Sequence, residues 1–312
     1  MPSSAAASRT ALAALLLLAY VTALQSDPRE VPFTIDGNCR HVYIDMGTNR
    51  GHQIRKLYEP HLYPANPTEP RFAQYFGSGN RFEEVCSFGF EANPIHSRVL
   101  RPLESAFLKL GGKVHIFNPV AVGTRDSDNI TFYRDANQRN EVGASLIPGV
   151  TQKGNLQPIT ITAMDIAAWI KTHIVNRTIP DGNQKFPPAI VMKSDIEGMD
   201  TTILSHLLHE RVLCNISFVY GEHMTVEFVN ATLAALRDEG CPTHIELLDD
   251  EFAPTDNMPP PTSASVNPAV QRVVDYMFLV MVLVAAGLFC RVAQPHRLFT
   301  RFRGKPKPVS LH

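Results

Sequence analysis

The middle of the chain, from about residue 39 to residue 252, alternates short β-branched runs with stretches of helical periodicity. Parallel strands need crossover connections, which are usually helices. The pattern therefore predicts an α/β domain whose mostly parallel sheet is covered by helices on both faces. Strands are expected at residues 41–45, 85–91, 111–117, 189–198 and 216–223, with a short hairpin arm at 129–135. Helices are expected after Gly51 and at residues 94–110, 163–175, 200–210 and 225–240.

Acidic residues gather at the ends of these predicted strands. In an open parallel sheet, ligands bind beyond the carboxyl ends of the strands. Acids brought to one edge also repel one another unless a ligand or a partner uses them. We therefore expect a binding site there, formed from Asp45, Glu91, Asp195, Glu197, Glu222 and His223.

The first predicted strand runs into a glycine-containing turn, Asp45-Met-Gly47-Thr48-Asn49-Arg-Gly51. Glycines let the backbone turn sharply and approach a ligand, and the following helix points its first amides at that ligand. The turn lacks both the dinucleotide fingerprint and the Walker phosphate loop. We therefore expect a nucleoside ligand with few negative charges. Glu91 would accept hydrogen bonds from the hydroxyls of its ribose. A nucleoside that carries an amino acid in place of phosphates describes S-adenosylmethionine.

Six blocks follow one another in the predicted domain: YIDMGTNRG (43–51), FGFEANP (88–94), AVGTRDSDNITFY (121–133), EVGASL (141–146), VMKSDIEGMD (191–200) and YGEHM (220–224). In this order they resemble the FkbM-type family of S-adenosylmethionine-dependent methyltransferases over about residues 41 to 250. The departures from the family pattern are Ala92, Ser194 and Asp200.

The resemblance implies a Rossmann-like class I methyltransferase fold with a seven-stranded sheet. It also implies that Glu91 holds the ribose of S-adenosylmethionine, with Ala92 and Asn93 beside the adenine. The methionine part would be held by Asp45, Gly47, Thr48, Asn49 and Gly51.

The expected reaction is methyl transfer to a hydroxyl of a glycan, a lipid or a small metabolite. Such a displacement needs an aligned acceptor, with a base or an orienting acid pair close to it. The candidates are Asp195, Glu197, Glu222 and His223, with His223 as the base because its unperturbed pKa is about 6.5. Alternatively, these side chains bind a divalent cation, or the acids only cap helices and pair with basic residues such as Lys193.

Two other functions stay open. Asp126 and Asp128 form an Asp-x-Asp pair that could serve a lumenal, membrane-anchored glycosyltransferase. A non-catalytic scaffold could also have this fold. The formal net charge of −1 gives no electrostatic support for nucleic-acid binding. The insert at residues 61–82 is expected to cover the site.

An apolar segment lies near each end of the chain. Residues 11–24 indicate a signal peptide or signal anchor within residues 1–26, and residues 273–292 are long enough for a transmembrane helix. A buried helix is the alternative for each. A Pro/Ser/Thr-rich stalk (253–270) precedes the second segment, and a basic tail (293–312) follows it, which favours a cytosolic tail. The chain is thus expected to be a single-pass protein of the endoplasmic reticulum, the Golgi or the cell surface, with domain 39–252 lumenal or extracellular.

Glycosylation motifs and cysteines agree with that placement. In an oxidising compartment the four cysteines of the domain could form two disulfides in any of three connectivities, or they could remain free buried thiols. The cysteines are Cys39, Cys86, Cys214 and Cys241, and the acceptor asparagines are Asn129, Asn176, Asn215 and Asn230.

Overall fold

The first strand, β1 (His41–Met46), is buried at all six residues and lies in the centre of a six-stranded sheet. The structure is a computed structural model that describes residues 30–79, 81–136, 141, 143–149, 156–181, 185–250 and 260–261. The strand order is β3-β2-β1-β7-β8-β9, and every neighbouring pair is parallel. The other strands are β2 (Val85–Phe90), β3 (Lys113–Phe117), β7 (Ile190–Ser194), β8 (Phe218–Gly221) and β9 (His244–Leu247).

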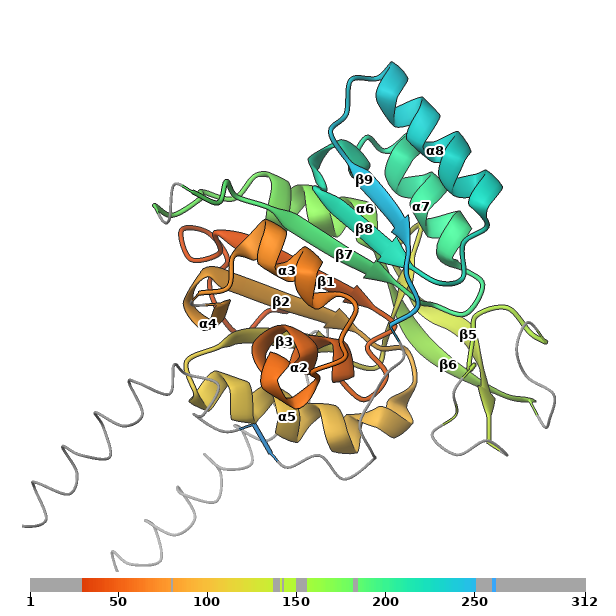
Figure 1. Cartoon of the computed structure of the whole chain (residues 1–312). Helices are drawn as coiled ribbons and strands as arrows, with labels where there is room; N and C mark the ends of the chain where they lie inside the picture. Colours follow the sequence, from red (N-terminus) through yellow and green to blue (C-terminus); the bar gives the residue numbers. More distant parts are fainter. Residues whose placement is uncertain are drawn as a thin grey trace, which may run out of the picture. The chain divides into compact units, whose positions relative to one another are not determined.

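Helices cover both faces of this sheet (Figure 1). Alternate residues of β1 point to opposite faces, so Tyr43 packs in one apolar cluster and Ile44 in the other. The Tyr43 face carries α2 (His52–Tyr58), α3 (Glu69–Phe76) and α5 (Ser97–Lys109). The Ile44 face carries α6 (Ile166–Trp169), which continues into the π-helix Ile170–Val175, then α7 (Asp200–His209) and α8 (Val226–Asp238). The chain is therefore a three-layer α/β fold with a doubly wound, Rossmann-like strand order.

A second sheet, of three strands, lies beside the six-stranded sheet (Figure 1). Its order is β4-β6-β5, with β4 parallel and β5 antiparallel to β6. The sequence predicted only a hairpin arm at 129–135 in this region. The bounds are β4 (Val120–Gly123), β5 (Ser127–Asp135) and β6 (Leu156–Asp165).

The expected elements are present with shifted ends. The helix expected from residue 163 starts at Ile166, because the side chain of Asp165 accepts hydrogen bonds from the amides of Ala167 and Ala168 and caps it. The strand expected to reach residue 198 ends at Ser194. The described residues supply six parallel strands of the seven that the family resemblance implies.

The packed domain begins before residue 39. Ile35 is buried in the core, and Val31 and Phe33 pack against it. The amide of Gly37 donates to the carbonyl of Thr178 at 2.9 Å, which ties this segment to the domain. Residues 31–38 therefore belong to the fold.

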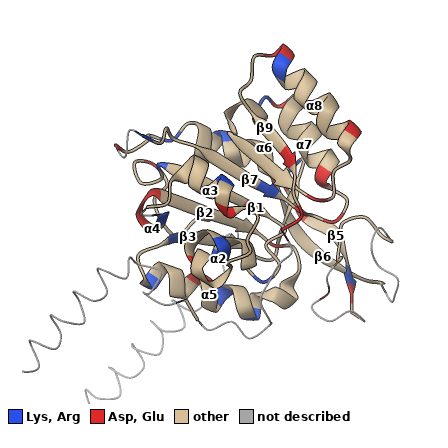
Figure 2. Ribbon diagram, viewed as in Figure 1, with Lys and Arg blue, Asp and Glu red and all other residues tan. Residues whose placement is uncertain are grey.

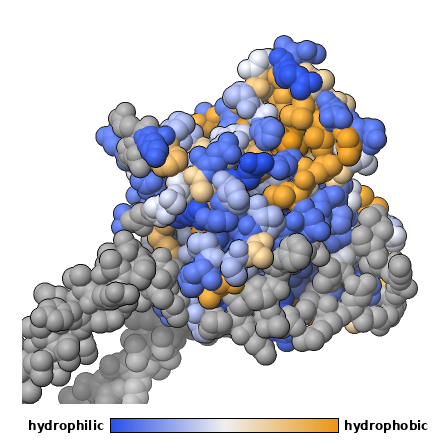
Figure 3. All heavy atoms as spheres, viewed as in Figure 1, coloured by the Kyte–Doolittle hydropathy of each residue, from blue (hydrophilic) through white to orange (hydrophobic). Residues whose placement is uncertain are grey.

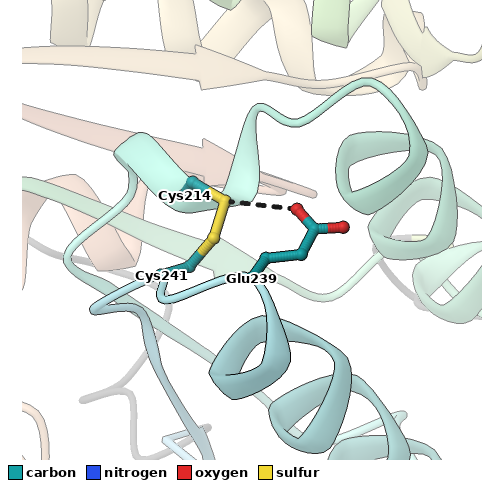
Figure 4. A group of neighbouring side chains, drawn as sticks. All are labelled: Cys214, Glu239 and Cys241. Atoms are coloured by element: carbon teal, nitrogen blue, oxygen red, sulfur yellow. Dashed lines mark hydrogen bonds between the residues drawn. A yellow bond between two sulfur atoms is a disulfide. The ribbon is translucent and has the colours of Figure 1, made fainter.

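Two disulfides join the four cysteines, Cys39 to Cys86 and Cys214 to Cys241. The first links the entry to β1 with β2, and the second links the turn after α7 to the segment after α8 (Figure 4). The structure therefore selects one of the three connectivities. All four acceptor asparagines are exposed, including Asn215, which lies in the short 3-10 helix Leu213–Asn215 rather than in a buried strand.

The segments at the two ends fall outside the described residues. These are the predicted signal segment 1–26, the stalk except Pro260 and Pro261, the transmembrane helix 273–292 and the tail 293–312. Among the residues that the structure does describe, no helix has the length and apolarity to cross a membrane.

Candidate functional site

The glycine turn is held between the ends of β2 and β7. The amides of Gly47 and Thr48 donate to the carbonyl of Phe90 at 3.0 and 3.1 Å, and the amide of Asp195 donates to the carbonyl of Met46 at 3.1 Å. Gly47 has φ 85°, and a Cβ built on it would lie 1.8 Å from the carbonyl oxygen of Asp195. This position therefore requires glycine.

A cavity opens where the carboxyl ends of β1, β2 and β7 meet. It lies at the switch point of the strand order, which is where doubly wound sheets bind their ligands. Its empty space is about 700 Å³, which includes open solvent at the mouth. Seven predicted site residues line it: Gly47, Asn49, Glu91, Ala92, Asn93, Asp195 and Glu197.

One wall of the cavity comes from the second sheet and the segment that bridges to it. This wall is mainly apolar, which suits a flat aromatic ring. The sequence predicted only a hairpin arm in this region and did not indicate that its apolar side chains reach the site. Its apolar members are Val120, Ala121, Val122, Phe132, Ala144 and Leu146.

Glu91 is 7% exposed, and both of its carboxylate oxygens accept backbone hydrogen bonds. Oε2 accepts from the amide of Asn49 and Oε1 from the amide of Asn93, each at 2.6 Å. Burial raises the pKa of Glu91 to about 8, although these two bonds oppose the shift. The carboxyl group is therefore fixed in place and only weakly ionised at neutral pH.

Asp45 lies behind the cavity wall and is fully buried. Neither carboxylate oxygen has a hydrogen-bond partner. Burial raises its pKa to about 6, and nearby Lys193 partly opposes this. Thr48 and Gly51 also lie outside the lining, and the hydroxyl of Thr48 donates to the carbonyl of Asp45. These three residues shape the turn without reaching the cavity in this structure.

Acidic and basic residues lie near one another where β7 ends and in the loops that follow β7 and β8 (Figure 2). Nζ of Lys193 lies 2.7 Å from Oδ2 of Asp195, which confirms Lys193 as a partner of one of the acids. Nε2 of His223 lies 3.1 Å from Oδ1 of Asp195, 3.8 Å from Oε2 of Glu197 and 3.7 Å from Oε1 of Glu222. The four predicted catalytic residues are thus brought together, but only Asp195 and Glu197 line the cavity.

The charges set the ionisation of this cluster. Burial alone would raise the pKa of Asp195, but Lys193 and His223 hold it well below its usual range. The close approach of Asp195 raises the pKa of His223 to about 9. His223 therefore holds its proton at neutral pH, which differs from the expectation of a free base.

Asp200 organises the loop between β7 and α7. It is fully buried, and Oδ1 accepts from the hydroxyl of Ser194 at 2.6 Å and from the amide of Ile196 at 3.3 Å. Oδ2 accepts from the amide of Gly198. Two of the departures from the family pattern, Ser194 and Asp200, thus bond to each other and hold the loop of Asp195 and Glu197.

The insert at residues 61–82 does not cover the cavity. None of its described residues lines the cavity, and Phe72 and Phe76 are buried against the sheet in the cluster of Tyr43. The expectation was wrong because the aromatic residues of the insert serve the core. Asp126 accepts a hydrogen bond from the amide of Asp165 at 2.9 Å, and neither Asp126 nor Asp128 lines the cavity.

Comparisons of the chain with protein-family models, with curated proteins and with solved structures find no match.

Proposed function

We propose that this chain is an S-adenosylmethionine-dependent methyltransferase that acts on a hydroxyl of a glycan, a lipid or a small metabolite. The observation that carries the proposal is the cavity at the switch point of the sheet. Its lining comes from five of the six sequence blocks, including those of Gly47, Glu91 and Asp195. These blocks are far apart in the chain, and their meeting at one cavity supports a shared ligand.

The residues present fit the cofactor in two respects. The carboxyl group of Glu91 lies at the end of β2, where an acid can accept hydrogen bonds from both hydroxyls of a ribose. The apolar wall of the cavity around Phe132 suits a flat adenine ring.

When bound, S-adenosylmethionine supplies a methyl group on a positively charged sulfur. Glu91 and Asn93 would hold the nucleoside, with the adenine against the apolar wall near Phe132. Asp195 and Glu197 would lie on the acceptor side and orient a hydroxyl. Protonated His223 would donate a hydrogen bond there, so the carboxylates are better placed than His223 to accept a proton.

Titration calorimetry of the purified full-length chain with S-adenosylmethionine tests the proposal. We expect saturable binding that Glu91→Gln weakens at least tenfold and that Glu210→Gln, at a surface ion pair with Lys171, leaves unchanged. Absence of heat at millimolar cofactor would contradict the proposal. Binding of a sugar nucleotide instead would favour the glycosyltransferase.

The acceptor class needs a second assay. Transfer of a labelled methyl group into glycan, lipid and small-metabolite fractions should label one of the three. Binding of the cofactor without transfer into any fraction would favour the scaffold.

A further inference from the structure

Two loops bring three metal-ligating side chains together at the cavity edge. Asp195 and Glu197 follow β7, and His223 follows β8. One ligand atom of each lies within 4.8 Å of the others. We propose that Asp195, Glu197 and His223 form a binding site for one divalent cation of the Mn²⁺ type.

The distances between the ligand atoms suit a shared ion. Ligands about 2.1 Å from an ion lie roughly 3.0 Å apart at a right angle and about 4.2 Å apart when opposite. Nε2 of His223 is 3.1 Å from Oδ1 of Asp195 and 3.8 Å from Oε2 of Glu197, and both distances fall in this range. The side chains could therefore hold an ion with little rearrangement.

Asp195 is held in place by two basic neighbours. Lys193 donates to Oδ2 at 2.7 Å, and Oδ1, which is excluded from solvent, lies 3.1 Å from Nε2 of His223. Because a ligand histidine must be neutral, an ion between Oδ1 and Nε2 would take the place of a proton on Nε2.

The ligand set indicates the kind of ion. Two carboxylates favour Mg²⁺, Ca²⁺ or Mn²⁺, whereas an imidazole favours transition metals. Mn²⁺ accepts both. The rest of its coordination would be water or an acceptor hydroxyl, since His223 is 36% exposed and the cluster is open on that side.

The site would also deepen the proposed function. An ion beside the cavity would lower the pKa of a bound hydroxyl and so activate it as a nucleophile. This consequence rests on the proposed methyl transfer, whereas binding of the ion does not.

The test is a titration of the chelator-stripped full-length chain with Mn²⁺, followed by the electron paramagnetic resonance signal of the free ion. We expect one saturable site, weakened at least tenfold by Glu197→Gln and by His223→Gln. Glu210→Gln removes a surface carboxylate outside the cluster and should bind Mn²⁺ with the same affinity as the parent. Circular dichroism of each variant checks that the fold is kept.

Two results would overturn the site: no saturable binding up to millimolar Mn²⁺, or equal affinity in the parent, Glu197→Gln and His223→Gln. Calorimetry with S-adenosylmethionine in the absence of metal separates the two proposals. Cofactor binding without Mn²⁺ binding would refute only the metal site, and the reverse would refute only the methyltransferase.

Discussion

Gly47→Ala places a methyl group where the turn after β1 touches the loop after β7. Its Cβ would lie 1.8 Å from the carbonyl oxygen of Asp195, and a contact below 3.0 Å is not tolerated, so the two loops must separate by 1.2 Å. The left-handed backbone, with φ 85°, costs an alanine about 1–2 kcal/mol. Overpacking adds roughly 1–3 kcal/mol. The expected loss of unfolding free energy is about 2–5 kcal/mol.

Gly111→Ala is the matched control. Gly111 has φ 86°, nearly the same as Gly47, but a Cβ there meets no atom within 4 Å. This variant should incur only the backbone cost of about 1–2 kcal/mol. The difference between the two variants therefore isolates the contact between the turn and the loop of Asp195.

Denaturant unfolding of the full-length chain measures the stabilities, and calorimetry measures S-adenosylmethionine affinity. Gly47→Ala should lose roughly 1–3 kcal/mol more than Gly111→Ala and should bind the cofactor at least tenfold more weakly, because the cavity lining has moved. Gly111→Ala should bind normally. Equal destabilisation of the two variants would refute the packing argument, and unchanged binding by Gly47→Ala would refute the placement of the ligand.

Three further predictions concern other residues. Burial raises the pKa of Glu91 to about 8, so the carboxylate that would hold the ribose forms as the pH rises through 8, and cofactor affinity should increase. Calorimetry at pH 7 and pH 9 should show this increase in the parent. Glu91→Gln should show no such pH dependence and should bind the cofactor roughly 10–150-fold more weakly. Lys193→Met removes the buried cation that lies between Asp195 and Asp45 and leaves His223 as the remaining basic neighbour of Asp195. It should cost about 3–5 kcal/mol in denaturant unfolding, and a cost below 1 kcal/mol would contradict the ion pair. The double variant Cys214→Ser/Cys241→Ser removes a disulfide that closes a loop with a sequence separation of 27 residues. It should lower the unfolding free energy by about 3–4 kcal/mol and leave the cofactor affinity unchanged. A loss of cofactor affinity would show that this disulfide shapes the cavity.

The sequence predicted the layered fold well because short, largely apolar strands alternate with stretches of helical periodicity along the chain. It missed β9 (His244–Leu247), whose four residues are too short to show a period. Of the second sheet it predicted only a hairpin arm at 129–135, because β5 and β6 are mixed in polarity and only partly buried. Short or half-exposed strands are specified by their neighbours, and those become known only in three dimensions.

The lining of the cavity was predicted where residues directly follow a strand, as for Glu91 and Asp195. The position of Asp45 behind the cavity wall was not predicted, because side chains alternate along β1. Asp45 shares a face with Tyr43, so its carboxylate turns toward the buried layer and not toward the cavity. The apolar wall around Phe132 was missed for the same reason as the sheet that carries it.

An apolar surface over α7 and α8 is a separate feature of the domain (Figure 3). Val226, at the start of α8, is 57% exposed. Together with Phe228 and Leu233, which are only partly buried, it makes this helix less polar outside than an ordinary surface helix.

The direction of β9 decides where the chain leaves the domain. Because β9 runs parallel to β8, it ends at the same edge of the sheet as the cavity, and Asp250 is fixed there by hydrogen bonds from Gln53 and Lys56. If residues 273–292 cross a bilayer, the 22 intervening residues can span at most about 80 Å. The length of this connection, and not a fixed docking surface, would then set how far from the lipid the carboxyl edge of the sheet can be.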